Sequence, residues 1–172
     1  MVVSDGVPVR AAMSDAQSFE DFFEAESGTL FRRFCLVTGN RSEAEEVMQD
    51  AFMKVFERWD RVSGMDDPVG YLYRVAFNEF KRRSRRAALA VRRTLRAAPR
   101  ADEFEAVDAR QTVLEALSHL TPRQRAALVL TEMLDYTSEE AGSLLGVRPV
   151  TVRSLASRGR IVLKQALGAS DE

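Results

Sequence analysis

Hydrophobic residues recur at three- and four-residue steps along most of the chain, which is the spacing of amphipathic helices. The first such run begins at Phe19 and ends at Gly39-Asn40, where a glycine after the last periodic residue is a typical helix stop. The second run, residues 42–59, opens with Ser42 and Glu45 at the spacing of a capping box. Its apolar positions predict a buried stripe made of Met48, Phe52, Val55, Phe56 and Trp59.

Residues 60–70 are rich in Gly, Pro and Asp and predict a loop. The helix expected after this loop has an apolar face formed by Val69, Leu72, Tyr73, Ala76 and Phe80. On the opposite face, Arg74, Asn78, Lys81 and Arg85 follow one another at steps of four, three and four residues. A basic, hydrogen-bonding ridge backed by a core can grip a nucleic-acid backbone and leave the loop to hold unstacked bases.

The last third of the chain carries a second set of helix signals. Thr121, Pro122 and Gln124 supply a capping residue, a proline at the first helical position and a glutamine at the third. Thr137 and Glu140 form another capping box. Gly146 then marks a sharp turn, and Pro149 is well placed to begin the next helix.

Two short helices joined by a tight turn are therefore expected between residues 136 and 163. At roughly 100° per residue, the second of them has an apolar arc made of Val152, Leu155, Ala156, Gly159 and Leu163. No acidic residue occurs between Glu140 and Asp171, so the opposite arc is basic. This pattern is typical of a helix-turn-helix whose second helix lies in a DNA major groove. The alternative is an ordinary helical hairpin with a solvated basic face.

No alternating strand pattern is present, so we expect an all-α fold of two small helical domains. The first domain should span residues 16–87 and the second residues 108–168. A linker at 88–107, which contains Pro99, joins them, and residues 1–15 are expected to form a disordered N-terminal arm.

The chain has 172 residues, of which 45% are hydrophobic and 30% charged, the usual balance of a globular protein. It contains neither a membrane-spanning apolar run nor a signal-peptide pattern, which predicts a cytoplasmic protein. One cysteine and one histidine cannot build a disulfide or a Cys/His metal site. We expect no metal, no cofactor and no catalytic residue, because no nucleophile–base pair is visible.

The net charge of −1 conceals alternating blocks of opposite charge. Residues 1–60 carry twelve acids and six bases, whereas residues 81–100 carry nine bases and no acid. The chain is acidic again over residues 102–140 and basic from Arg148 onward. Basic blocks suit phosphate, so the chain is expected to present surfaces for at least two kinds of partner.

Three segments, in this order, resemble bacterial sigma-70-type sigma factors of the extracytoplasmic-function class. Residues 42–59 resemble the region 2 helix that docks on the β′ clamp helices of core RNA polymerase. Residues 67–86 resemble the helix that binds the minus-ten element. Residues 120–154 resemble region 4, which binds the minus-thirty-five element and the β flap. The resemblance covers Phe19 to Leu167, and it implies a region 2 helical bundle joined to a region 4 helix-turn-helix.

This resemblance implies a promoter-specificity subunit without enzymatic activity. Its partners would be core polymerase, promoter DNA as duplex and as melted single strand, and an anti-sigma factor, with no membrane insertion. Polymerase contacts are expected at Glu43, Glu46, Gln49, Asp50 and Phe52. Minus-ten contacts are expected at Arg74, Asn78, Lys81, Arg82 and Arg85. Upstream contacts are expected at Arg148, Val150, Thr151, Arg153, Ser154, Arg158 and Arg160.

The chain departs from the family pattern within its predicted helix-turn-helix. Leu155 stands where the family has an arginine, Ala156 replaces a core leucine, and Gly142 and Gly159 stand where alanine is favoured. Two other functions stay open on the residues alone. One is a helix-turn-helix regulator that binds an operator as a dimer without being a polymerase subunit, and the other is a helical adaptor with no DNA role.

Overall fold

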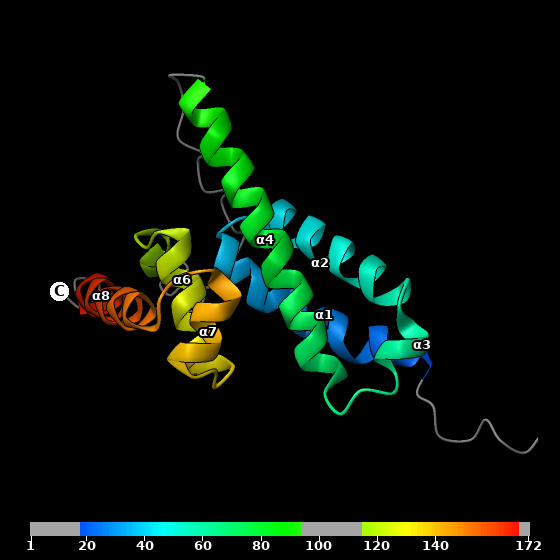
Figure 1. Ribbon diagram of the computed structural model, residues 1–172. Helices are drawn as coiled ribbons and strands as arrows, with labels where there is room; N and C mark the ends of the chain where they lie inside the picture. Colours follow the sequence, from blue (N-terminus) through cyan, green and yellow to red (C-terminus); the bar gives the residue numbers. More distant parts are fainter. Residues whose placement is uncertain (1–17, 94–114, 169–172) are drawn as a thin grey trace, which may run out of the picture.

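The computed structural model describes residues 18–93 and 115–168, and within these ranges all regular structure is helical (Figure 1). The all-α prediction is therefore confirmed. The expected N-terminal arm and most of the expected linker lie outside the described residues. The elements are α1 (Phe19–Thr38), α2 (Arg41–Phe56), α3 (Trp59–Val62), α4 (Pro68–Arg93), α6 (Pro122–Leu128), the π-helix η1 (Val129–Met133), α7 (Ser138–Leu145) and α8 (Pro149–Gly168).

The first helices begin and end at side chains that satisfy free backbone groups. The Ser18 side chain accepts a hydrogen bond from the Asp21 amide at the start of α1, and Gly39 ends the helix with φ 67°. The expected Ser42–Glu45 capping box at the start of α2 is wrong. Asn40 is the cap instead, because its side-chain oxygen accepts from the Glu43 amide at 2.8 Å and the helix already begins at Arg41.

Two expectations about the end of α2 also fail. Phe56 is 60% exposed rather than part of a buried stripe. Trp59 does not continue α2 but begins the four-residue helix α3, so the irregular connection to α4 is shorter than the loop expected over residues 60–70. The buried side of α2 consists of smaller residues in part, namely Ala44, Val47, Ala51, Phe52 and Val55.

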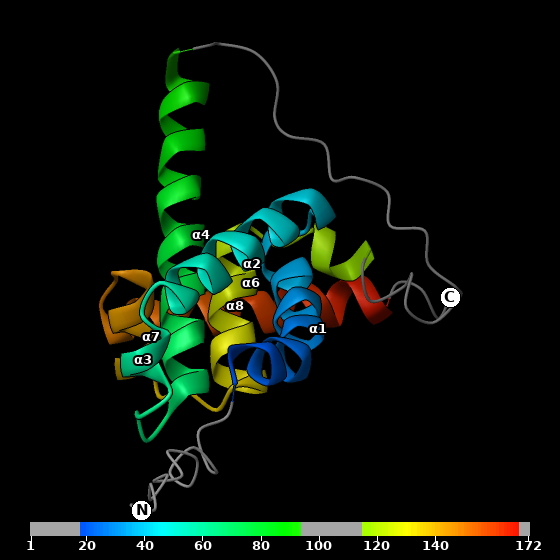
Figure 2. The same cartoon turned by 90° about the vertical axis from the view of Figure 1, so that its right-hand side faces the viewer.

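Helix α4 is the longest element, and its upper end extends beyond the other helices (Figures 1 and 2). It begins at Pro68, where the Asp67 carboxylate accepts a hydrogen bond from the Gly70 amide at 2.7 Å. Its buried side packs Leu72, Tyr73, Ala76, Phe77 and Phe80 into the core. The helix continues to Arg93, beyond position 88 at which we expected the linker to begin.

The helix signals of the second half are confirmed. Thr121 and Gln124 form a reciprocal capping box with Pro122 at the first turn, and Thr137 and Glu140 form another. Gly146 ends α7 in the left-handed conformation with φ 68°, a value that glycine adopts without strain. The π-helix η1 directly follows α6. Its hydrophobic pattern does not distinguish a π-helix from an α-helix, so the sequence analysis did not predict it.

The two halves of the chain pack against each other. Helix α6 lies beside α1, and α7 lies beside α4, as the two views show (Figures 1 and 2). Buried residues from both halves, such as Phe34 of α1 and Leu130 of η1, belong to one continuous apolar cluster. Within the described residues, the two halves are therefore in direct contact through a shared apolar core.

Candidate functional site

The basic ridge of α4 forms as expected. Arg74, Asn78 and Arg85 are exposed and Lys81 is half-buried, while the opposite side of the helix is packed in the core. Lys81 donates a hydrogen bond from Nζ to the main-chain oxygen of Leu144 in α7, at 3.1 Å. The ridge thus offers three cations and an amide, the groups that hold phosphates and bases of a single strand.

Arg82, which was expected as a further minus-ten contact, lies on a different side of α4 from the ridge. Its Nε donates to the Glu79 carboxylate at 2.9 Å, and its Nη2 lies 3.6 Å from Asp50 of α2. Glu79 is buried and also pairs with Lys54. Burial alone would raise the pKa of Glu79, but hydrogen bonds from Lys54 and Arg82 outweigh burial and hold the pKa below its usual range.

The acidic side of α2 is largely paired within the chain. Arg83 of α4 donates to Glu46 and, at 2.7 Å, to Asp50. Glu43 is half-buried, and burial raises its pKa despite the nearby Arg83 and Arg125. Gln49 is exposed, whereas Phe52 is only 3% exposed. Of the five expected polymerase contacts, Glu46 and Gln49 are exposed, and Glu46 is paired with Arg83.

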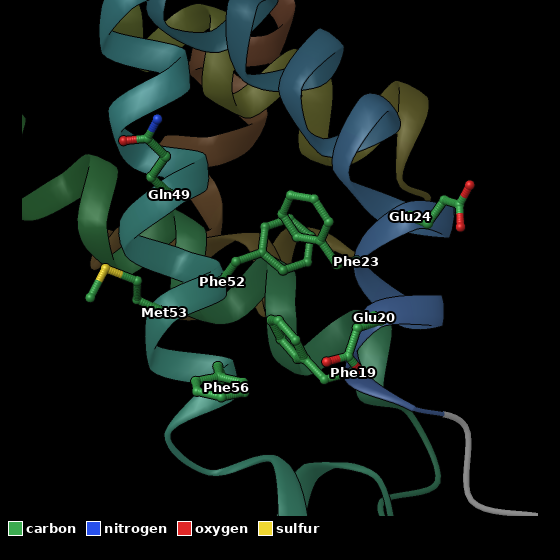
Figure 3. A pocket seen from close by; sticks show the side chains of 8 residues that line it. All are labelled: Phe19, Glu20, Phe23, Glu24, Gln49, Phe52, Met53 and Phe56. Carbon is green, nitrogen blue, oxygen red and sulfur yellow. The ribbon is translucent and has the colours of Figure 1, made fainter.

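An apolar groove lies between the start of α1 and the end of α2, next to Gln49 (Figure 3). It has a volume of about 730 Å³, and the Phe23 and Phe52 rings meet inside it with centroids 4.8 Å apart. Met53 and Phe56 are 63% and 60% exposed on its α2 side. The groove is lined by Phe19, Glu20, Phe23, Glu24, Gln49, Phe52, Met53 and Phe56.

Sequence reasoning did not find this groove. Periodicity assigned Phe56 to a buried stripe, but among the described residues no element covers its ring at the end of α2, so the ring is exposed there. The available signal was the number of large apolar residues close together in the sequence, namely Phe19, Phe22 and Phe23 in one helix and Phe52, Met53 and Phe56 in the next. Large exposed apolar side chains gathered in one place mark an interaction surface.

The second basic surface lies on α8 and on Arg148, the residue directly before it. Arg148, Val150, Arg153, Arg158 and Arg160 are exposed, and Thr151 and Ser154 are half-buried. Arg153 lies 3.6 Å from Glu139, and Arg160 pairs with Glu132 at 2.5 Å. Both ion pairs are exposed and therefore weak, so the arginines can exchange these partners for DNA phosphates.

The unusual residues of the helix-turn-helix have a packing role. Ala156 is buried, and Leu155 packs against the core rather than joining the basic face. A Cβ on Gly159 would lie 2.8 Å from Leu128 Cδ1, and a Cβ on Gly142 would lie 2.8 Å from the Val147 carbonyl oxygen. These glycines allow α8 to approach α6 and the turn to close against α7.

Within residues 18–93 and 115–168, no helix is long and apolar enough to cross a membrane. The same residues contain no group of three or more His, Cys, Asp or Glu side chains placed to hold a metal ion.

Two family models match the chain in the order of its halves. The model for Sigma-70 region 2 matches residues 22–90, and the model for Sigma-70, region 4 matches residues 110–163. The first match contains the α4 ridge and most of the groove, and the second contains the helix-turn-helix.

Curated proteins resemble the chain over nearly its whole length. The RNA polymerase sigma-E factor of Streptomyces coelicolor is 26% identical over 92% of this chain and 91% of its own. The ECF RNA polymerase sigma factor SigM of Mycobacterium tuberculosis is 29% identical over 90% of this chain and 79% of its own.

A solved structure has a similar fold. The sigma factor RpoE of Bartonella quintana, crystallised with the anti-sigma factor NepR, superposes with a TM-score of 0.65 at 22% identity, covering 87% of this chain and 96% of that one. The two family models and the curated relatives agree with the residue patterns of the sequence. The chain therefore belongs to the sigma-70 family of RNA polymerase sigma factors, in its extracytoplasmic-function class.

Proposed function

We propose that this sigma factor binds core RNA polymerase through the groove between α1 and α2, and that it reads promoter DNA at two places. The α8 face would contact the upstream element as duplex, and the α4 ridge would hold the melted strand of the minus-ten element. The protein would act in the cytoplasm, where the polymerase acts, with an anti-sigma factor as the regulator that its class implies.

One observation carries this proposal. The chain presents two separate basic surfaces, the α4 ridge and the α8 face, together with an apolar groove on a third side. An operator-binding regulator needs the α8 face but has no use for a cationic ridge that is suited to a single strand. A groove that exposes Phe23, Met53 and Phe56 also needs a protein partner.

The polar side chains of α8 and α4 would make different kinds of DNA contact. On α8, Arg153, Ser154 and Arg158 can donate to base edges and phosphates in the major groove, and Val150 can meet a thymine methyl group. On α4, Asn78 would bond an unstacked base while Arg74, Lys81 and Arg85 hold the backbone. Melting would be driven by this binding energy, so the chain itself would not need to hydrolyse a nucleotide.

The polymerase contact would rest on apolar burial more than on charge. Glu46 and Asp50 already pair with Arg83, so a basic partner would have to displace an existing ion pair to use them. The exposed side chains of Met53 and Phe56 gain free energy from burial without losing any partner. Gln49 at the rim of the groove would supply a directional hydrogen bond.

Run-off transcription with core polymerase and a library of genomic promoters tests the proposal. We expect a discrete set of transcripts that appears only when the sigma factor is added. A gel-shift assay with the same DNA and no polymerase tests the alternative function, because an operator-binding regulator would bind this DNA tightly without polymerase. Tight polymerase-free binding without any sigma-dependent transcript would overturn the proposal.

A further inference from the structure

Two acidic residues that lie outside α8 pair with arginines on its exposed side. Arg160 donates from Nη1 to the Glu132 carboxylate of η1 at 2.5 Å. Arg153 Nη1 lies 3.6 Å from the Glu139 carboxylate in the first turn of α7. Each of these four side chains exposes half or more of its area, so both pairs are surface contacts that can break without unfolding the chain.

The two ion pairs are in register along α8. Arg153 and Arg160 are seven residues apart, which is nearly two full turns, so they lie on one side of the helix about 10 Å from each other. Glu132 and Glu139 are also seven residues apart, although they belong to two different elements. Because α7 packs beside α8 (Figure 1), η1 and the start of α7 each present one carboxylate to the same edge of α8.

The rest of the basic surface is not neutralised in this way. Arg148 and Arg158 are exposed, and within residues 115–168 neither of them has an ion pair. Arg158 follows Arg153 by five residues, which places it about 140° away around the helix, on the other edge of the exposed side. The two carboxylates therefore neutralise one edge of α8 and leave the other edge positively charged.

A carboxylate beside an arginine competes with a DNA phosphate for the same donors. In a helix-turn-helix the second helix lies in the major groove and the first crosses the DNA backbone, so the edge of α8 beside α7 is close to phosphates. DNA that approaches this edge must replace Glu132 and Glu139 as the partners of the two arginines. It must also come near two negative charges, and both effects oppose binding.

We propose that Glu132 and Glu139 weaken duplex binding by the sigma factor on its own, because they compete with DNA phosphates for Arg160 and Arg153. This inference rests on the proposed function, which assigns upstream DNA to α8. The α8 contacts are then strong enough to hold DNA only when polymerase and the α4 ridge add theirs. The competition limits binding of the free chain to unrelated DNA, which far outnumbers promoters.

Affinity for a fluorescent DNA duplex of mixed sequence, measured by anisotropy without polymerase, tests the competition. A mixed sequence suffices because the exchange of a carboxylate for a phosphate needs no particular base. Glu132→Gln should bind about threefold more tightly than wild type, which is the effect of one exposed ion pair. Glu139→Gln should gain about twofold, because its pair is longer. The double variant should gain about sixfold, since contacts about 10 Å apart add independently.

A double-mutant cycle separates competition for an arginine from a general effect of negative charge. Arg160→Gln should abolish the gain from Glu132→Gln, because the carboxylate then has no arginine to withhold from DNA. A threefold gain that persists in the Glu132→Gln/Arg160→Gln variant would overturn the proposal. Glu115→Gln is the matched control, because this exposed acid lies in the same half of the chain and has no ion pair among the described residues. It should bind like wild type, and a gain equal to that of Glu132→Gln would also overturn the proposal.

Folding is checked by circular dichroism of each variant. Glu139 lies in the first turn of α7, where an acid favours the helix dipole, so if Glu139→Gln lowers the helix content, Glu132→Gln decides. The outcomes also separate this inference from the proposed function. Variants that bind the duplex no more tightly than wild type refute the competition alone, whereas wild type that gives no sigma-dependent transcript refutes the proposed function.

Discussion

Arg83 places its Nη2 atom 2.7 Å from the Oδ2 atom of Asp50, joining α4 to α2. The same guanidinium pairs with Glu46, and the nearby Asp50 and Glu46 raise the pKa of Arg83. The acidic face of α2, which the sequence analysis assigned to polymerase binding, therefore also joins α2 to α4 through the ion pairs of Arg83 with Glu46 and Asp50. This double use decides what the following variants should do.

Removing the ion pairs between Arg83 and α2 should lower the stability of the folded chain. Arg83→Gln removes both ion pairs, and because these groups are partly exposed we expect the free energy of unfolding to fall by about 1 kcal/mol. Urea unfolding of Arg83→Gln, Asp50→Asn and the double variant gives the coupling between them. Additive losses, with no coupling, would show that the pair contributes nothing.

Removing apolar side chains from the groove should weaken polymerase binding without unfolding the chain. Phe56→Ser and Met53→Ser each delete a side chain that is mostly exposed, so we expect little change in stability. Binding to core polymerase, measured by titration, should weaken about 10- to 30-fold for each, the size of an interface anchor. Val150→Ser is the matched control, since Val150 is 54% exposed on a different helix. Equal affinities for all three variants would exclude the groove as the docking surface.

Glu79 should make stability sensitive to acid. Because its pKa is lowered in the folded chain, its contribution is present above the unfolded value near 4.5 and is lost as the pH falls toward the folded pKa. Glu79→Gln should lose about 1–2 kcal/mol at pH 7 and should show a flatter decline of stability below pH 4.5. Thermal melting across pH measures both effects, with Glu57→Gln as an exposed control; parallel acid profiles would contradict the assignment.

Asn78 should matter for DNA opening and not for assembly. Its side chain is exposed on α4, so Asn78→Ala should fold normally and bind core polymerase as wild type does. We expect fewer open complexes on a sigma-dependent promoter, detected by permanganate reactivity of unpaired thymines. The same reactivity in the variant and the wild type would refute a base contact at this position.

The exposed arginines of α8 should contribute electrostatically to upstream binding. Arg153→Ala and Arg158→Ala should weaken holoenzyme binding to duplex promoter DNA, and removing one arginine–phosphate interaction should reduce the slope of log affinity against log salt by about 0.9. Ser157→Ala, between them in sequence and also exposed, should leave the slope unchanged. An unaltered slope in the arginine variants would place DNA elsewhere.

Local signals predicted local structure well. The Thr121 and Thr137 caps and the Gly146 turn were predictable because each depends on residues within one helical turn. Ser42 was the wrong cap because Asn40, two residues earlier, offers the same hydrogen bond. Phe56 was misplaced because periodicity identifies a face of a helix and does not tell how far the neighbouring elements extend along it.

Contacts between residues far apart in the chain could not be predicted from the sequence pattern. Nothing in the residues around Arg125 indicates that its guanidinium reaches Val37 and Thr38, 88 and 87 positions away. The pairing of Arg83 with α2 is similar, since a basic residue beside a ridge suggests a DNA contact or a solvated surface. The groove also arises from how the start of α1 packs beside the end of α2, which is a tertiary property.

The close packing at Gly159 means that the two sides of α8 tolerate substitution to different degrees. On the packed side, Val152, Ala156 and Gly159 are fitted against α6 so closely that a single added methyl group at position 159 would meet Leu128. The other side carries Arg153 and Arg158 in solvent, where substitutions cost little stability. Promoter preference can therefore diverge among descendants of this protein by surface changes alone, on a helix whose position is inherited unchanged.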